Sequence, residues 1–138
     1  MTSASRRTPR LHIVTGAPGT GKTAIIQQLG PAIHRMPEPA RAVIADYRLI
    51  EGPDAGQPPV EVFVDLLLQR SIEHYETAQE LQGLVVFDRG VPDCIAYAEW
   101  FGTDQGRAWR PRNAPRIRMR FSLCGRGKRS TPPTTSAR

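Results

Sequence analysis

The sequence has little that would place the protein in a membrane, outside the cell or around a metal cluster. Only two of its 138 residues are cysteines, and Cys94 and Cys124 match no metal-ligand spacing and build no disulfide framework. No apolar run approaches the ~20 residues needed to cross a bilayer, and no apolar segment follows the N-terminal arginines as a secretory signal requires. We therefore expect a cytoplasmic protein with no membrane partner.

Acidic residues are missing from the C-terminal part of the chain. Residues 1–106 carry 9 Lys and Arg against all 13 Asp and Glu, whereas residues 107–138 carry 10 basic residues and no acid. The net charge is therefore −4 before residue 107 and +10 after it, which excludes a uniformly basic nucleic-acid-binding domain. The length and the 39% hydrophobic content are those of a single globular domain.

Strands and helices alternate along the first three quarters of the chain. Short apolar runs predict strands at 11–15, 32–36 and 84–87. Helical spacing and helix-boundary residues predict helices at 22–29, 39–47, 58–81 and 92–100. This order predicts an α/β fold with a parallel sheet and helices on both faces.

The alternation stops near residue 106. Residues 1–9 are polar and basic and predict a disordered lead-in, residues 10–106 the folded domain, and residues 107–138 a basic tail of low complexity. Within this tail only 117–123 alternates as a strand would. We expect that the tail is read out of frame or belongs to a truncated gene. The sheet would then be incomplete at its C-terminal end, with poor stability and weak or absent catalysis.

The segment GAPGTGKT, Gly16 to Thr23, matches the phosphate-binding pattern G-x-x-x-x-G-K-[ST] between a predicted strand and a predicted helix. Its glycines let backbone N–H groups approach an anion, and the helix start directs its positive end toward the same place. Lys22 is expected to contact the β- and γ-phosphates, and the Thr23 hydroxyl to bind Mg²⁺. A glycine-rich turn that binds nothing is the alternative. The predicted nucleotide-binding residues are Gly16, Ala17, Pro18, Gly19, Thr20, Gly21, Lys22 and Thr23.

A second acid, Asp88, directly follows the predicted strand 84–87. An acid there is expected to lie near Mg²⁺, usually through water, and the alternative is an aspartate that caps the next turn. Arg89 follows where ATP-hydrolysing motors commonly place a glutamate that orients water. An arginine cannot act as a base, but it can neutralise charge on a transferring phosphoryl group or pair with an acid. This residue favours transfer over hydrolysis.

Glu38 follows the predicted strand 32–36 and is the third candidate. Its carboxylate would project beside the phosphate-binding loop, where it could accept a proton from a substrate hydroxyl or hold a ribose. The alternative is an acid at a helix N-terminus that complements the helix dipole. Arg41, one turn later, could bind substrate phosphate or pair with Glu38.

Four segments together carry a family resemblance: the loop 16–23, Pro37 to Arg41, Tyr75 to Ala78, and the run Phe87-Asp88-Arg89-Gly90-Val91-Pro92-Asp93. Over about residues 10–104 the chain resembles small AAA-type ATPase-like proteins. These are related to the ribosylnicotinamide kinase domain of the bacterial NadR protein and, more distantly, to deoxynucleoside and thymidylate kinases. The resemblance implies a P-loop kinase-like fold, ATP or GTP with Mg²⁺, and a small phosphate acceptor.

Three functions stay open. The first is a kinase that acts on a small, nucleoside-like hydroxyl, and the second is an ATPase whose hydrolysis drives a conformational switch. The third is nucleic-acid binding through the basic tail, with Trp109 and Phe121 stacking on bases, but composition favours a disordered tail. For the first function the expected catalytic residues are Lys22, Asp88, Arg89 and Glu38, and the expected metal ligands are Thr23 and Asp88.

Overall fold

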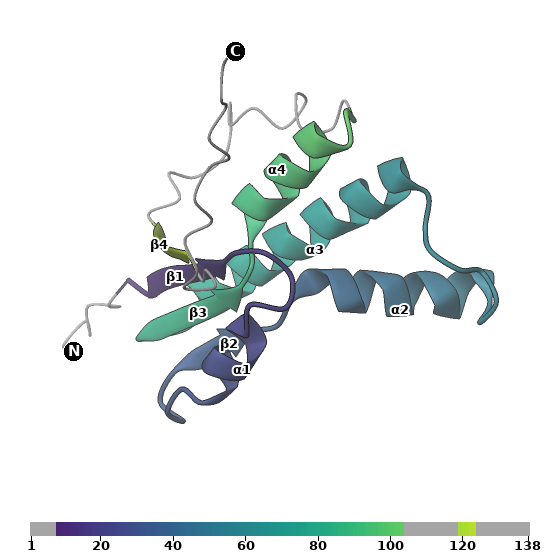
Figure 1. Cartoon of the computed structure of the whole chain (residues 1–138). Helices are drawn as coiled ribbons and strands as arrows, with labels where there is room; N and C mark the ends of the chain where they lie inside the picture. The colour runs from purple at the N-terminus through teal and green to yellow at the C-terminus, as the bar shows by residue number, and fades with distance from the viewer. Residues whose placement is uncertain (1–7, 104–118, 124–138) are drawn as a thin grey trace, which may run out of the picture.

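Four parallel strands lie at the centre of the fold, in the order β2-β3-β1-β4 (Figure 1). The computed structural model describes residues 8–103 and 119–123. In chain order the elements are β1 (Arg10–Thr15), α1 (Lys22–Gln27), β2 (His34–Met36), α2 (Pro39–Glu51), α3 (Val60–Gln79), β3 (Leu84–Asp88), α4 (Val91–Trp100) and β4 (Met119–Leu123).

The strand register brings the ends of the strands to one edge of the sheet. β1 pairs with β3 from Arg10↔Leu84 to Val14↔Asp88, and β2 pairs with β3 from His34↔Val85 to Met36↔Phe87. β4 lies on the other side of β1. Because all these pairs are parallel, the segments that follow β1, β2 and β3 emerge at the same edge, which is where open α/β sheets bind ligands.

Helices cover both faces of the sheet. On one face, Tyr75 and Ala78 of α3 pack into the core cluster with residues of β1, β2 and β3. The cluster consists of Leu11, Ile13, Met36, Tyr75, Ala78, Val85 and Phe87. On the other face, α1 contacts β3, and Ile26 and Val86 are buried. Since side chains alternate along a strand, Val86 and Asp88 lie on this second face. The predicted α/β fold with helices on both faces is confirmed.

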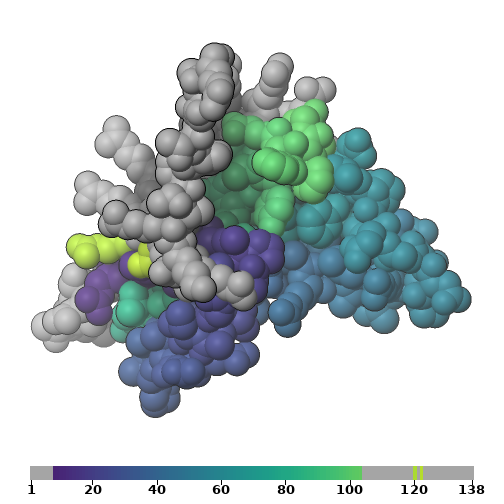
Figure 2. Space-filling model, viewed as in Figure 1, coloured from purple at the N-terminus to yellow at the C-terminus, as the bar shows by residue number. Residues whose placement is uncertain are grey.

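The helices α2 and α3 form an antiparallel pair that extends away from the sheet (Figure 1). α3 also packs against α4, so it is the middle helix of the three. In the space-filling view the same pair projects from the body of the molecule (Figure 2). The sheet end of α3 contributes Tyr75 and Ala78 to the core.

The predicted elements occur, with ends that differ by up to four residues. α3 spans Val60–Gln79 rather than 58–81, and β2 begins at His34 rather than at residue 32. α2 continues past the predicted end at residue 47 to Glu51, and it stops where Gly52 takes a φ of 107°. α1 stops at Gln27 rather than residue 29, because Gln28 and Leu29 bond to carbonyls three residues back. β4 falls inside 117–123, the one part of the tail that alternates as a strand would.

Several predictions from the sequence fall on residues outside the described part of the chain. They concern the lead-in and most of the basic tail, including Trp109 and the arginines up to residue 118. In the tail, β4 alone is described, and Arg120 and Ser122 are exposed there. Within the described residues, no helix is long and apolar enough to span a bilayer.

Candidate functional site

The loop from Gly16 to Thr23 joins β1 to α1 and curves around the position of Lys22. Gly19 and Gly21 have φ values of 70° and 85°, in the left-handed region that side chains disfavour. A Cβ at either position would meet nothing within 4 Å, so the requirement for glycine is conformational rather than steric. The glycine spacing of the motif therefore corresponds to the backbone shape of a phosphate-binding loop.

Lys22 is buried inside this loop. The side-chain ammonium Nζ donates to the carbonyl oxygens of Gly16 at 3.0 Å and Ala17 at 2.7 Å, and it lies 3.3 Å from Thr20 Oγ1. Lys22 is only 6% exposed, so its charge is held within the curve of the loop by these oxygens. The arrangement keeps a cation next to the backbone N–H groups that would surround a phosphate.

Thr23 and Asp88, the two predicted metal ligands, are in direct contact. Thr23 Oγ1 donates to Asp88 Oδ2 at 2.5 Å, which links the start of α1 to the end of β3. Asp88 is 2% exposed, and its other oxygen, Oδ1, has no hydrogen-bond partner among the described residues. An unpartnered buried oxygen is costly unless a donor or a cation satisfies it.

This pair fits Mg²⁺ bound together with nucleotide. Mg²⁺ is usually held by one or two protein oxygens, by phosphate and by water, rather than by a cage of side chains. No group of three or more His, Cys, Asp or Glu residues in the described part of the chain could hold a metal by itself. The hydroxyl of Thr23 and the free oxygen of Asp88 are thus suited to a metal whose remaining ligands come from phosphates and water.

Arg89 is held from several sides. Its backbone has a φ of 66°, which is uncommon for a residue with a side chain, and its N–H donates to the Val14 carbonyl at 3.0 Å. The guanidinium Nε donates to Glu38 Oε1 at 3.2 Å, and Nη1 lies 3.5 Å from Asp93 Oδ1. The Tyr97 ring centroid is 5.9 Å from the guanidinium carbon. The side chain is 10% exposed, so these contacts fix a largely desolvated cation.

Glu38 immediately precedes α2, but its carboxylate makes no capping hydrogen bond to that helix. One oxygen accepts from Arg89, and the other lies 3.6 Å from Arg41 Nε. Glu38 is 24% exposed, while Arg41 is 81% exposed and stands at the rim. Of the alternatives that the sequence left open for Arg41, the ion pair with Glu38 is present.

Among the predicted residues, Thr23, Glu38 and Asp88 line a cavity of about 470 Å³, whereas Lys22 and Arg89 do not line it. Its remaining lining is Ile26, Gln27, Arg35, Met36, Pro37, Arg41 and Ala42. The Arg35 guanidinium is committed elsewhere, because it donates to backbone carbonyls of Ile26 and Leu29. The volume suits a small molecule bound next to the phosphate-binding loop.

Three residues that complete this site, Thr15, Asp93 and Tyr97, have no role in the sequence analysis. Asp93 accepts hydrogen bonds from Thr15 Oγ1 and from the Gly90 N–H at 3.0 Å, and it faces Arg89. Tyr97 lies one turn further along α4, and its ring faces the Arg89 guanidinium in a cation–π contact. Asp93 could have been found from its place in the motif that follows Asp88. The sequence has no pattern that points to Thr15 or Tyr97.

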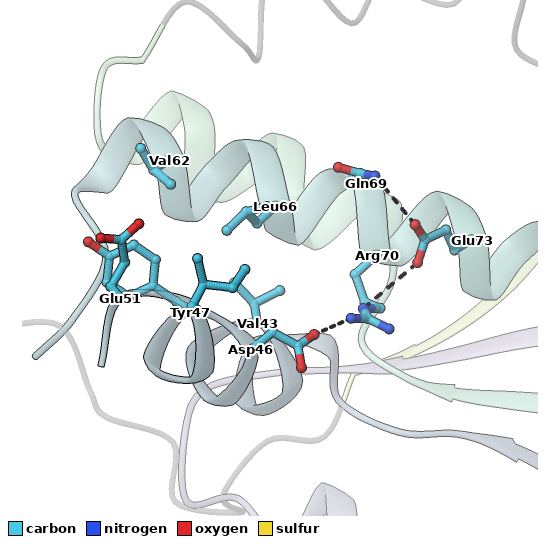
Figure 3. A pocket seen from close by; sticks show the side chains of 10 residues that line it. Val43, Asp46, Tyr47, Glu51, Val62, Leu66, Gln69, Arg70 and Glu73 are labelled. Atoms are coloured by element: carbon cyan, nitrogen blue, oxygen red, sulfur yellow. Dashed lines mark hydrogen bonds and ion pairs between the residues drawn. The ribbon is translucent and has the colours of Figure 1, made fainter. Parts of the chain in front are cut away.

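A second cavity, of about 290 Å³, lies between α2 and α3, far along the helical pair (Figure 3). Apolar side chains such as Val43 and Leu66 line it together with a charged cluster. In that cluster Arg70 pairs with Asp46 and lies 3.8 Å from Glu73 (Figure 3). None of the residues predicted from the sequence lines this cavity.

Cys94 is buried and does not take part in the chemistry of the site. Burial raises the pKa of its thiol to about 11, and the thiol lies 3.1 Å from Ser71 Oγ. A thiol with so high a pKa is almost entirely protonated near neutral pH and is a poor nucleophile. It packs between α4 and α3 as a small apolar side chain.

A comparison with protein families finds a match that spans the residues of this site. The model of a family described as an AAA domain matches residues 11–123, which is most of the chain. The match includes the phosphate-binding loop, Glu38, Asp88 and Arg89, and it extends through β4, beyond the last motif that the sequence analysis compared. No curated protein matches the chain.

Proposed function

The chain belongs to this AAA domain family, and from that premise we propose that it is a kinase-like enzyme that transfers a phosphoryl group from MgATP or MgGTP to a small hydroxyl-bearing acceptor. Nucleotide binding follows from the family and its P-loop. The observation that carries the proposed transfer is a shared cavity. The carboxylate of Glu38 lines the same 470 Å³ space as Thr23 and Asp88.

The nucleotide phosphates would lie along the loop Gly16 to Thr23. Its backbone N–H groups and the Lys22 ammonium bind and orient them, and the ammonium exchanges its bonds to the Gly16 and Ala17 carbonyls for bonds to phosphate oxygens. Thr23 and Asp88 would hold Mg²⁺, which when bound neutralises charge on the transferring phosphoryl group.

Glu38 would act as the general base. One of its oxygens takes the proton from the acceptor hydroxyl as the hydroxyl oxygen attacks the terminal phosphorus. The bond between that phosphorus and the bridging oxygen of the β-phosphate breaks, and ADP or GDP leaves. The other oxygen of Glu38 stays paired with Arg89, so the carboxylate keeps one orientation. The guanidinium of Arg89 also contributes positive charge beside the reacting phosphoryl group.

Transfer is favoured over hydrolysis by the residue that follows Asp88. An arginine in that place cannot take a proton from water, since its guanidinium stays protonated. The only described carboxylates that line the cavity are Glu38 and Asp88, and Asp88 is bonded to Thr23. A water molecule at Glu38 would give slow hydrolysis, which a bound acceptor would suppress.

Acceptor-dependent formation of ADP tests the proposal. ADP production from MgATP is measured with and without a panel of nucleosides and other small alcohols, and at least one member should raise it. Glu38→Gln should lower that rate by about 10²–10⁴-fold and leave ATP binding unchanged. Glu61→Gln is the matched control, since Glu61 is an exposed acid in the first turn of α3.

Two other results of these assays would point away from a kinase. ADP production that no acceptor changes, but that Lys22→Ala abolishes, would favour the ATPase switch. Failure to bind any nucleoside triphosphate would contradict both functions, because each begins with the phosphate-binding loop.

A further inference from the structure

One carboxylate links the end of β1 to the segment that follows β3. Asp93, in the first turn of α4, accepts hydrogen bonds from Thr15 Oγ1 at the end of β1 and from the Gly90 N–H at 3.0 Å. The same side chain lies 3.5 Å from Arg89 Nη1 and is only 9% exposed. The phosphate-binding loop begins at the residue after Thr15. A single group thus spans the start of that loop and the segment after Asp88.

The guanidinium of Arg89 lies between two carboxylates from different helices. Glu38, at the start of α2, contacts Nε, and Asp93 of α4 contacts Nη1. Tyr97, one turn beyond Asp93, covers the guanidinium with its ring. α4 therefore supplies two of the three contacts that set the direction of the Arg89 side chain.

Resting on the proposed function, we propose that Asp93 is a positioning residue that orients Arg89 and, through Arg89, the carboxylate of Glu38. With Asp93 neutral, Glu38 is the only charged acceptor left beside the guanidinium among the described residues. Arginine then favours a two-bond pairing with that carboxylate. Such a pairing occupies both Glu38 oxygens, including the one that would receive the acceptor proton.

A purely structural role for Asp93 makes a different prediction. An acid in the first turn of a helix commonly accepts a backbone N–H there and complements the helix dipole. That role accounts for the bond from Gly90, but not for the contacts to Thr15 and Arg89. Asp93→Asn keeps an acceptor for Gly90 and removes the charge that Arg89 faces, so it separates the two roles.

The first test is made on the nucleotide-free full-length chain by nuclear magnetic resonance. The Nε–H signal of Arg89, assigned through Arg89→Lys, should exchange slowly with water in the unmodified protein because the group is bonded and desolvated. Asp93→Asn should shift this signal and change its exchange rate at least severalfold. Glu99→Gln, which removes an exposed acid of α4, should leave it unchanged. An unchanged Arg89 signal in Asp93→Asn overturns the proposal.

A second variant decides the question if Asp93→Asn does not fold. Asp93→Glu keeps the negative charge and should keep the Arg89 Nε–H in slow exchange. Rapid exchange in that variant overturns the proposal. Neither measurement involves phosphoryl transfer, so failure here is distinct from failure of the proposed kinase function.

The second test uses the acceptor that the screen described above identifies. Asp93→Asn should lower kcat by about ten- to a hundredfold, the usual effect of misplacing a reacting group by a fraction of an ångström to one ångström. The KM for MgATP should stay within about twofold, because the phosphate-binding loop keeps its own contacts. A raised KM with unchanged kcat would show that Asp93 supports only the loop, and it overturns the proposal.

Discussion

At the scale of single residues, Gly90 occupies a place that has no room for a side chain. A Cβ there would lie 2.9 Å from Ile13 Cδ1, and Ile13 is fully buried in the core. Because the neighbour is a packed core residue, we expect Gly90→Ala to lower the free energy of unfolding by about 1–3 kcal/mol, the usual cost of overpacking. Urea unfolding of the variant and of the unmodified chain measures the difference.

A double-mutant cycle identifies the cause. Ile13→Val removes Cδ1, the atom nearest to the new Cβ, so the double variant should lose less free energy than the two single variants added together. Gly30→Ala is the matched control, since a Cβ at Gly30 meets nothing within 4 Å and should change little. Strict additivity of the two losses would contradict the steric explanation.

Single residues also show which parts of the site can be predicted from a sequence. The phosphate-binding loop could be located because its glycines, lysine and threonine are adjacent in the chain, and Asp88 because it directly follows an apolar strand. The contacts of Arg89 with Glu38, and of Asp93 with Thr15, join positions far apart in the sequence. Residue type and spacing do not specify such pairs, since they depend on the strand register.

At the scale of helices and strands, position was easier to predict than length. β3 was predictable because a strand buried on both faces is almost wholly apolar, and α3 because its apolar residues recur at helical spacing. The end of α2 was missed by four residues, because Leu49 and Ile50 are exposed at 83% and 80% and give no amphipathic signal. Only the conformation of Gly52 marks that end.

His74 makes the stability of α3 depend on pH. Burial, and then the positive charge of Arg70, holds the pKa of His74 below its ordinary value of 6.5, with Glu73 opposing. The folded protein therefore favours the neutral ring, and its contribution to stability is complete above pH 6.5. It is lost as the pH falls from 6.5 toward the lowered pKa of the folded state. When the pH is lowered from about 7.5 to about 5.5, we expect the free energy of unfolding to fall less in His74→Gln than in the unmodified chain.

Urea unfolding at the two pH values measures this difference, and Arg70→Gln tests its cause. Removing the Arg70 charge should return the pKa of His74 only part of the way to 6.5, because burial is the larger effect. The pH dependence of Arg70→Gln should therefore lie between those of the unmodified chain and His74→Gln. Equal pH dependence in all three proteins would contradict a role for His74.

At the scale of the whole molecule, the fold brings three separate segments to one edge of the sheet. The loop after β1, Glu38 after β2, and Asp88 with Arg89 after β3 meet because their strands are parallel and adjacent. α4 contacts Arg89 at this edge through Asp93 and Tyr97. A ligand at this edge would contact segments from three strands at once, so its binding should stabilise the molecule as a unit.

We expect MgATP to raise the melting temperature of the chain. At a ligand concentration about 100 times Kd the gain is about 2.7 kcal/mol, or roughly 10 °C for a domain of this size. AMP lacks the β- and γ-phosphates that Lys22 would contact and should give a much smaller shift. Differential scanning fluorimetry of the full chain, with each nucleotide and with Mg²⁺ present or absent, measures these shifts.

Two substitutions separate the contribution of phosphate binding from the contribution of Mg²⁺ to this thermal stabilisation. Lys22→Ala should abolish the response to MgATP, because the only ammonium within the loop is removed. Thr23→Val should keep a response to ATP alone and lose the further gain from Mg²⁺, since the hydroxyl beside Asp88 is removed and the shape of the side chain is kept. If the Mg²⁺-dependent gain survives in Thr23→Val but disappears in Asp88→Asn, the aspartate holds the metal without the threonine. If it survives in both, the metal lies elsewhere, and the buried oxygen of Asp88 needs another partner.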